Sequence, residues 1–216
     1  MKFVAVCIFL VSSGMLFAQK AFTGKLVYRV EIADTSLQNM FPPSTMTIYT
    51  NDTILRVETR TDALGAQVLI QHMEKKKAYL LIESPMGKYA IQIPEKEEEV
   101  EKKYTYKKAK GKKTVQGLDS KKLLVANISI KEQLEFYYHK KIAAKYLPGF
   151  EDFPGLLTDY YVVSTDGVYH HQLVECTPQQ VSRDLFGIPS DYQKITMSDF
   201  VDLVTGGQEE QILERK

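Results

Sequence analysis

Short runs in which apolar and polar residues alternate, separated by tight turns, constrain this sequence more than any other feature. In residues 24–32, GKLVYRVEI, charged residues alternate with an apolar set formed by Leu26, Tyr28, Val30 and Ile32. An alternation with a period of two is typical of a β-strand that buries one face. The first part of the chain therefore predicts a half-buried strand.

The same pattern returns along the chain, over residues 44–50, 53–60, 66–73, 77–84, 87–93, 120–130, 132–139, 159–165 and 168–176. Asn51-Asp52 and Asp166-Gly167 each separate two of these runs, and both pairs are typical of two-residue hairpin turns. Short strands joined by tight turns are typical of an antiparallel sandwich or barrel. The sequence therefore predicts a mainly β protein.

Helix signals are confined to the C-terminal part of the chain. Thr177 followed by Pro178 has the pattern of a helix N-cap with proline at the first helical position. A second helix is predicted to begin at Ser198, with an apolar face formed by Phe200, Leu203 and Val204. We expect short C-terminal helical segments, followed by a polar tail over residues 208–216.

Residues 1–18 have the order of a secretory signal peptide. Lys2 precedes an apolar run over residues 3–10, and Ala18 ends a cleavage site, so that Gln19 becomes the first residue of the mature chain. The apolar run is shorter than the roughly 20 residues that a membrane-spanning helix needs, and no later stretch is long enough. We therefore expect cleavage between Ala18 and Gln19 and a location in the periplasm of a Gram-negative envelope or outside the cell.

Cysteine content and net charge exclude a fold stabilised by intrachain disulfides and give no support for a nucleic-acid-binding protein. Removal of residues 1–18 leaves Cys176 as the single cysteine, so no intrachain disulfide can form, and an exported chain must be stabilised by its core. Without Lys2 the mature chain carries 27 basic and 27 acidic residues. A neutral chain gives no electrostatic case for nucleic-acid binding, and we expect none.

One stretch is strongly biased in charge. Residues 95–101 hold five glutamates, and residues 102–113 hold seven lysines without an acidic residue. The lysines could contact anionic lipid head groups. They could equally belong to a hairpin that lysines keep soluble, because charged side chains protect exposed strand edges from pairing.

The sequence lacks the motifs of common catalytic and metal sites. Gly-x-Ser-x-Gly, His-Glu-x-x-His, Cys-x-x-Cys and a complete P-loop are absent. His170 and His171 are neighbours on a predicted strand and therefore point to opposite faces, so they cannot bind one metal ion together. We expect no enzyme activity, no catalytic residue, no cofactor and no metal.

The segment PGFEDFPGLLTDYY at residues 148–161 poses a question of its own. Its prolines and glycines indicate a loop, and loops are usually polar. This one carries four large apolar side chains, those of Phe150, Phe153, Leu156 and Leu157. Such a loop either covers apolar space that a ligand can occupy or packs against the core as ordinary cover.

Several segments, in this order, resemble a known group of proteins. They are TGKLVYRVEI, NDTILRVET, QHMEKKKAYLL, KTVQGLDSKKLLV, LPGFEDFPGLLTDYYV and LFGIPSDYQKI, and they extend over most of residues 22–197. The sequence resembles an uncharacterised family of exported envelope proteins in the lipoprotein-carrier superfamily, which has the LolA/LolB-like fold. Relatives often carry a cysteine after the QG turn, where this chain has Asp119 and Ser120.

The resemblance implies a single antiparallel, incompletely closed β-barrel of about eleven strands over residues 19–207, with helical segments across one opening. In the carriers the concave apolar interior holds acyl chains. On this basis the residues expected to line the interior or to form a lid over it are Tyr28, Val30, Met46, Ile48, Leu55, Val57, Phe136, Tyr138, Phe150, Phe153, Leu156 and Leu157.

Three functions remain open at this point. The first is a noncatalytic envelope protein that binds a lipid, an acyl chain or another hydrophobic ligand inside the barrel. The second is an interaction or structural module whose interior is filled by its own side chains, since barrels of about eight strands can be filled or can hold one ligand. The third is an enzyme, which no motif in the sequence supports.

Overall fold

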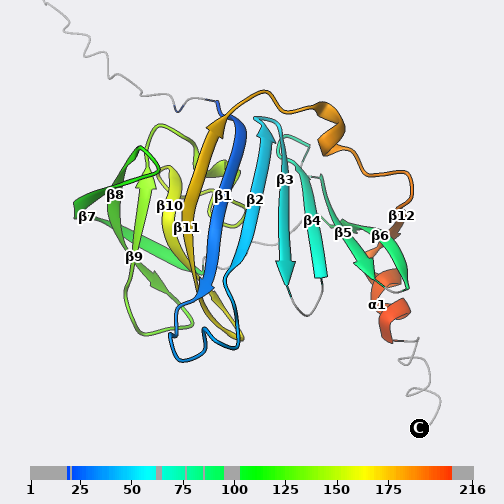
Figure 1. Cartoon of the computed structure of the whole chain (residues 1–216), viewed down its shortest axis with the longest axis horizontal. Helices are drawn as coiled ribbons and strands as arrows, with labels where there is room; N and C mark the ends of the chain where they lie inside the picture. Colours follow the sequence, from blue (N-terminus) through cyan, green and yellow to red (C-terminus); the bar gives the residue numbers. More distant parts are fainter. Residues whose placement is uncertain are drawn as a thin grey trace, which may run out of the picture.

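Consecutive strands pair with one another along most of the chain and build one twelve-stranded sheet (Figure 1). The computed structural model describes residue 19 and residues 21–61, 65–75, 77–84, 86–94 and 103–205. The strands are β1 (Thr23–Ile32), β2 (Ser44–Asn51), β3 (Ile54–Thr61), β4 (Gly65–His72), β5 (Lys77–Ser84), β6 (Gly87–Ile93), β7 (Tyr104–Val115), β8 (Leu118–Asn127), β9 (Leu134–His139), β10 (Leu156–Ser164), β11 (Gly167–Pro178) and β12 (Gln193–Thr196).

The strand order is β12-β6-β5-β4-β3-β2-β1-β11-β10-β9-β8-β7. Strand β1 lies inside the sheet, where it pairs with β2 on one side and with β11 on the other. All pairs are antiparallel except β12 with β6, which is parallel. Among the described residues no strand pairs with the outer edges of β7 and β12, so hydrogen bonds do not close the sheet.

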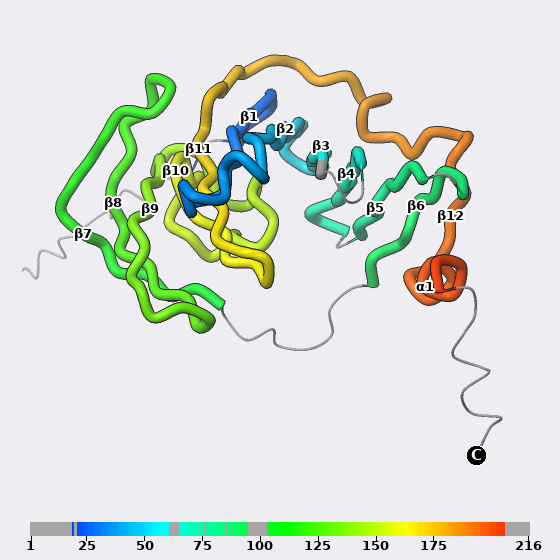
Figure 2. Tube along the Cα trace, turned by 60° about the horizontal axis from the view of Figure 1, so that its bottom comes forward, coloured from blue at the N-terminus to red at the C-terminus, as the bar shows by residue number. Residues whose placement is uncertain are grey.

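The sheet is curved, and its two faces have different cover (Figure 2). The segment between β9 and β10 lies inside the curve, whereas the segment between β11 and β12 runs over the outside. The largest cluster of buried apolar side chains joins residues of β1–β3 and β8–β11 to the β9–β10 segment. We call the face that carries this cluster the concave face and the opposite one the convex face.

The predicted mainly β class is confirmed, but the details differ from the expected antiparallel sheet of about eleven strands. Strands β7 and β12 are additional to the ten runs predicted from the sequence, and the four residues of β12 are too few to show a periodic pattern. Strand β7 extends through the lysine-rich stretch and forms a hairpin with β8 around Gln116-Gly117. The lysine-rich residues 104–113 therefore belong to an edge strand.

The helix predicted to start at Thr177 is wrong. Thr177 lies in β11 opposite Lys25 of β1, and the strand continues to Pro178. Pairing with β1 keeps these residues extended, so a tertiary contact overrides a local capping pattern. The chain forms only a 3₁₀ turn later, η2 (Arg183–Phe186), where the Ser182 hydroxyl accepts a hydrogen bond from the backbone N–H of Asp184.

The second predicted helix is confirmed as α1 (Met197–Thr205). It begins one residue earlier than expected, because Thr196 and Asp199 cap it reciprocally, with two hydrogen bonds of 3.1 Å between side chains and backbone N–H groups. Phe200 packs against Tyr89 of β6 with the ring centroids 5.9 Å apart. Leu203 and Val204 are exposed. The predicted signal peptide, Ala18 of the predicted cleavage site and the tail over residues 208–216 lie outside the described residues.

Candidate functional site

A row of apolar side chains crosses the concave face from the middle of the sheet to one edge. Each member lies directly opposite the next in the register of neighbouring strands β1 to β6, and a parallel pair adds β12. In spatial order the row consists of Leu26, Ile48, Val57, Leu69, Leu80, Ile91 and Ile195. Neighbouring strands lie about 4.8 Å apart, so the part from β2 to β6 extends over roughly 19 Å.

The row is well covered on both sides of its centre, although its last member, Ile195 of the short edge strand β12, is itself half-buried. Leu26 and Ile48 are fully buried in the main core cluster, and Ile91 is fully buried beneath β12 and α1. Between them, Leu69 of β4 and Leu80 of β5 are only half-buried. The apolar row therefore keeps accessible surface on the two strands at its centre.

The rows on either side of the apolar row carry polar groups. Thr59 and Gln67 face each other on one side, and Gln71 lies opposite Ala78 on the other. Hydroxyl and amide side chains can orient the polar end of a ligand whose apolar part lies on the leucines. The same two rows also contain Leu55 and Ile82, so the concave face of β3–β5 combines an apolar strip with single polar side chains on either side of it.

A pocket of about 340 Å³ opens where β4 meets the β9–β10 segment. Its lining is formed by Asp52, Gln71, Met73, Glu74, Lys145 and Glu151. Pockets that hold small ligands have volumes of about 300–1,000 Å³, so this one lies at the lower end of the range. Gln71 lines the pocket and also lies in the row next to the apolar row, so the two features adjoin each other.

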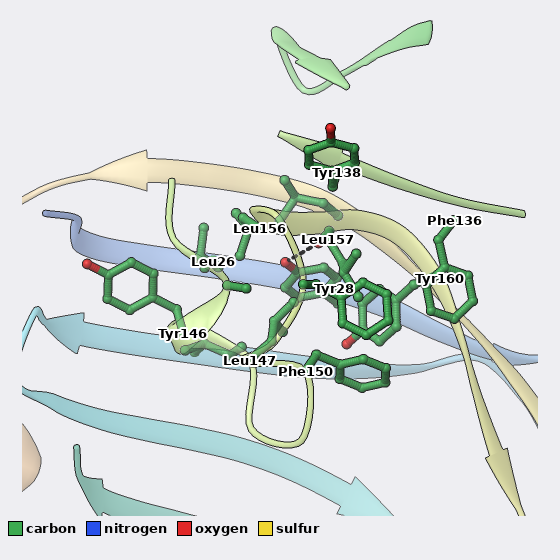
Figure 3. Packing of buried hydrophobic residues seen from close by; sticks show 14 of the residues in the cluster. Leu26, Tyr28, Phe136, Tyr138, Tyr146, Leu147, Phe150, Leu156, Leu157 and Tyr160 are labelled. Atoms are coloured by element: carbon green, nitrogen blue, oxygen red, sulfur yellow. Dashed lines mark hydrogen bonds between the residues drawn. The ribbon is translucent and has the colours of Figure 1, made fainter. Parts of the chain in front are cut away.

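Residues 140–155, between β9 and β10, fill the rest of the concave face, and we call this segment the plug. It contains the 3₁₀ turn η1 (Ala144–Tyr146). Phe150 and Phe153 are each 8% exposed. The ring centroids of Phe150 and Tyr160 lie 5.0 Å apart (Figure 3). The ring centroids of Phe153 and Phe136 lie 5.9 Å apart. The plug is thus packed into the core by aromatic side chains.

The structure brings most of the predicted lining and lid residues together. One core cluster contains ten of them: Tyr28, Ile48, Leu55, Val57, Phe136, Tyr138, Phe150, Phe153, Leu156 and Leu157. Met46 packs against this cluster. Val30 is half-buried and lies between Ser44 and His171 in the strand register. Leu156 and Leu157 are fully buried in β10 and are not loop residues.

A cluster of polar contacts, formed by Asp52, Lys145 and Tyr146, connects the plug to the β2–β3 turn. The Tyr146 hydroxyl accepts a hydrogen bond of 2.7 Å from the backbone N–H of Phe22 and donates one to the Asp52 carboxylate. The Lys145 ammonium lies 2.7 Å from the same carboxylate. Burial acts to raise the pKa of Asp52, but Lys145 and Tyr146 outweigh it and lower that pKa. Burial and the contact with Asp52 raise the pKa of Tyr146.

This polar cluster was not predicted from the sequence. Asp52 was identified only as a turn residue, and its φ of 77° fits that role. Lys145 and Tyr146 come 93 and 94 residues later, and no local pattern links them to Asp52. The half-buried leucines at 69 and 80 were also missed as site residues, although their alternation was visible.

His170 and His171 point to opposite faces, as the strand geometry predicts. On the convex face, His170 Nε2 lies 3.1 Å from Asp159 and Nδ1 lies 3.7 Å from Glu31. The hydrogen bond with Asp159 raises the pKa of His170 despite its burial. Both ring nitrogens face carboxylates, so neither is available to activate a nucleophile, as a catalytic histidine must.

His171 lies on the concave side and stacks on Tyr160, with ring centroids 4.8 Å apart. Burial lowers the pKa of His171 to about 4. Its Nδ1 atom is buried and has no hydrogen-bond partner among the described residues. Within the same part of the chain, no three His, Cys, Asp or Glu side chains are arranged to hold a metal ion together.

Comparisons with known proteins add a fold relationship. No protein-family model matches the sequence, and no curated protein matches it. A crystal structure of an uncharacterized conserved protein from Thermus thermophilus is similar, with a TM-score of 0.51 and 12% sequence identity. The alignment covers 83% of this chain and 94% of that one, and at such low identity it shows a shared fold alone. Among the described residues no helix has the length and apolar character needed to cross a membrane.

Proposed function

We propose that this chain is an exported, noncatalytic envelope protein that binds a lipid or another hydrophobic ligand on its concave face. In this proposal the curved sheet acts as an incompletely closed barrel of the LolA/LolB-like kind, in the periplasm or outside the cell. The ligand lies along the apolar row over β3, β4 and β5. The plug occupies the remainder of the interior and forms one wall of the site.

The observation that carries the proposal is the incomplete cover of the apolar row at its centre. Leu69 and Leu80 lie between two buried members of the same row, Val57 and Ile91, yet they remain half-buried. Each methylene group that leaves water contributes about 0.8 kcal/mol. A ligand on this row would remove from water both its own chain and the exposed surface of the two leucines. The burial of these groups would contribute to the free energy of binding.

The proposal is tested by titrating the purified protein with a fluorescent fatty acid. We expect saturable binding by the wild type and at least tenfold weaker binding by the double variant Leu69→Gln, Leu80→Gln. The matched control is Leu124→Gln, which changes a half-buried leucine of β8 that lies opposite Glu135 on the convex face. This control should bind the fatty acid as the wild type does.

Thermal melts of the same variants separate binding from folding. If the double variant and the control melt within a few degrees of each other, a loss of binding reports on the site. Absence of binding by the wild type would reject the proposal. Equal binding by the double variant and the wild type would place the ligand elsewhere and reject this site.

One observation favours the alternative, an interaction or structural module with a filled interior. The plug occupies the concave face next to β8–β10 with side chains that are almost fully buried. On this alternative the half-buried leucines are ordinary surface of a packed domain. A wild-type protein that binds no fatty acid but associates with another envelope protein through this face would support it.

A further inference from the structure

The hairpin of β7 and β8 forms one edge of the sheet, and lysine side chains lie on its concave face. In the strand register, Lys112 of β7 lies opposite Lys121 of β8, and Lys121 lies opposite Tyr138 of β9. Lys108 lies opposite Leu123, a fully buried core residue. Tyr138 and Leu123 belong to the core cluster on the concave face, so the three lysines point to that side. We call Lys108, Lys112 and Lys121 the cationic rim.

The cationic rim contrasts with two of the lysines on the convex face of the same hairpin. There Lys113 contacts Asp159 at 2.5 Å, and Lys122 forms an ion pair with Glu135. The lysines of the cationic rim are exposed and have no ion pair among the described residues. Like charges directly opposite each other on neighbouring strands destabilise a sheet. Folding alone therefore gives no reason for the pair formed by Lys112 and Lys121.

Protection of the sheet edge explains only part of this arrangement. Lysines on an edge strand discourage pairing with other chains, and this accounts for Lys108 and Lys112 of β7. Lys121 is on the inner strand β8, where no edge needs protection. The ladder of β7 and β8 is also interrupted between Lys108 and Lys112, and such a bulge already hinders the addition of a partner strand.

An exposed aromatic residue accompanies the lysines. Tyr106 lies two residues before Lys108 in β7, is 37% exposed, and stacks on Phe153 at 5.0 Å between ring centroids. Tyrosine has an apolar ring and a polar hydroxyl, a combination found where proteins meet the surface of a bilayer. Lysine side chains can extend their ammonium groups toward lipid phosphates from the same position.

We propose that the cationic rim docks this protein on a bilayer surface that carries anionic phospholipids. The bulge argues against an acidic peptide that would add as a further strand, whereas a flat anionic surface needs only accessible charge. This docking is independent of the proposed ligand on β3–β5, because it uses the opposite end of the sheet. It would hold the open edge of the concave face against the membrane.

Sedimentation with lipid vesicles tests the proposal. The purified chain is mixed with vesicles of phosphatidylethanolamine and phosphatidylglycerol, and with vesicles of phosphatidylcholine alone. A basic residue near an anionic bilayer favours binding by about fivefold, so Lys108→Gln, Lys112→Gln, Lys121→Gln should weaken binding to the anionic vesicles on the order of 100-fold. Binding by the wild type should fall as salt is raised, because salt screens exposed charges.

The matched control removes three exposed lysines at the other end of the sheet, Lys75, Lys77 and Lys194, again as glutamines. All variants keep the same N-terminus, so residues 1–18 contribute equally to each. We expect the control to bind anionic vesicles nearly as the wild type does. Equal losses in the two triple variants, or equal binding of the wild type to anionic and neutral vesicles, would overturn the proposal. Fatty-acid binding is measured separately and does not depend on this outcome.

Discussion

His170 and His171 are adjacent, but their surroundings act on their protonation in opposite directions. The hydrogen bond with Asp159 raises the pKa of His170, so this contact stabilises the fold fully below pH 6.5. That contribution is lost as the pH rises through the raised value. Burial holds His171 neutral down to a pKa of about 4. Because an unfolded histidine takes up a proton near pH 6.5, the folded state loses stability as the pH falls from 6.5 toward 4.

The first prediction follows from His171. Between pH 6.5 and pH 4 its protonation in the unfolded chain lowers the free energy of unfolding by about 3 kcal/mol. His171→Phe keeps a ring against Tyr160 and removes this linkage, so its urea-unfolding free energy should fall less over that range than that of the wild type. His170→Gln is the control and should keep the acid loss. An unchanged acid dependence in His171→Phe would show that His171 is not held neutral in the fold.

At the scale of the element, the plug behaves as part of the core. Phe153 contacts Phe136 and Tyr106 and is almost fully buried. We therefore predict that Phe153→Ser lowers the free energy of unfolding by about 3–5 kcal/mol, as truncation of a buried phenylalanine does. Ile128→Ser changes a side chain that is 59% exposed and should have little effect. If denaturant unfolding shows Phe153→Ser to be as stable as the wild type, the segment is a mobile lid instead.

The elements differ in how far the sequence could predict them. Strands such as β2 and β3 follow directly from their alternation, because all their buried residues lie on the concave face, whereas β5 and β6 bury residues on both faces. Thr177 shows the limit of local patterns, since the register with β1 decided its conformation. The burial of Phe150 could not be predicted, because its aromatic partners lie on three different strands that no local pattern brings together. These partners are Tyr104, Phe136 and Tyr160. For the same reason the sequence predicts the apolar residues of the plug but not the contact of the plug with Asp52.

At the scale of the molecule, the sheet combines a packed half and a more open half. The pairing of β1 with β11 joins the N-terminal strands β1–β6 to the later strands β7–β11. The plug fills the interior of the later strands, and α1 with β12 covers the far edge of the earlier ones (Figure 2). Between these two covers lie β4 and β5. A mainly β fold was predictable, but this uneven cover depends on contacts between distant segments.

Covalent labelling with a photoreactive fatty acid tests most directly whether this uneven cover is a ligand site. After irradiation of the purified protein and digestion, mass spectrometry locates the labelled peptides. The account predicts saturable labels within β4 and β5, near Leu69 and Leu80, that an excess of unlabelled fatty acid removes. The double variant Leu69→Gln, Leu80→Gln should lose these labels. Labels confined to the convex face or to exposed α1, or no saturable label at all, would contradict the account.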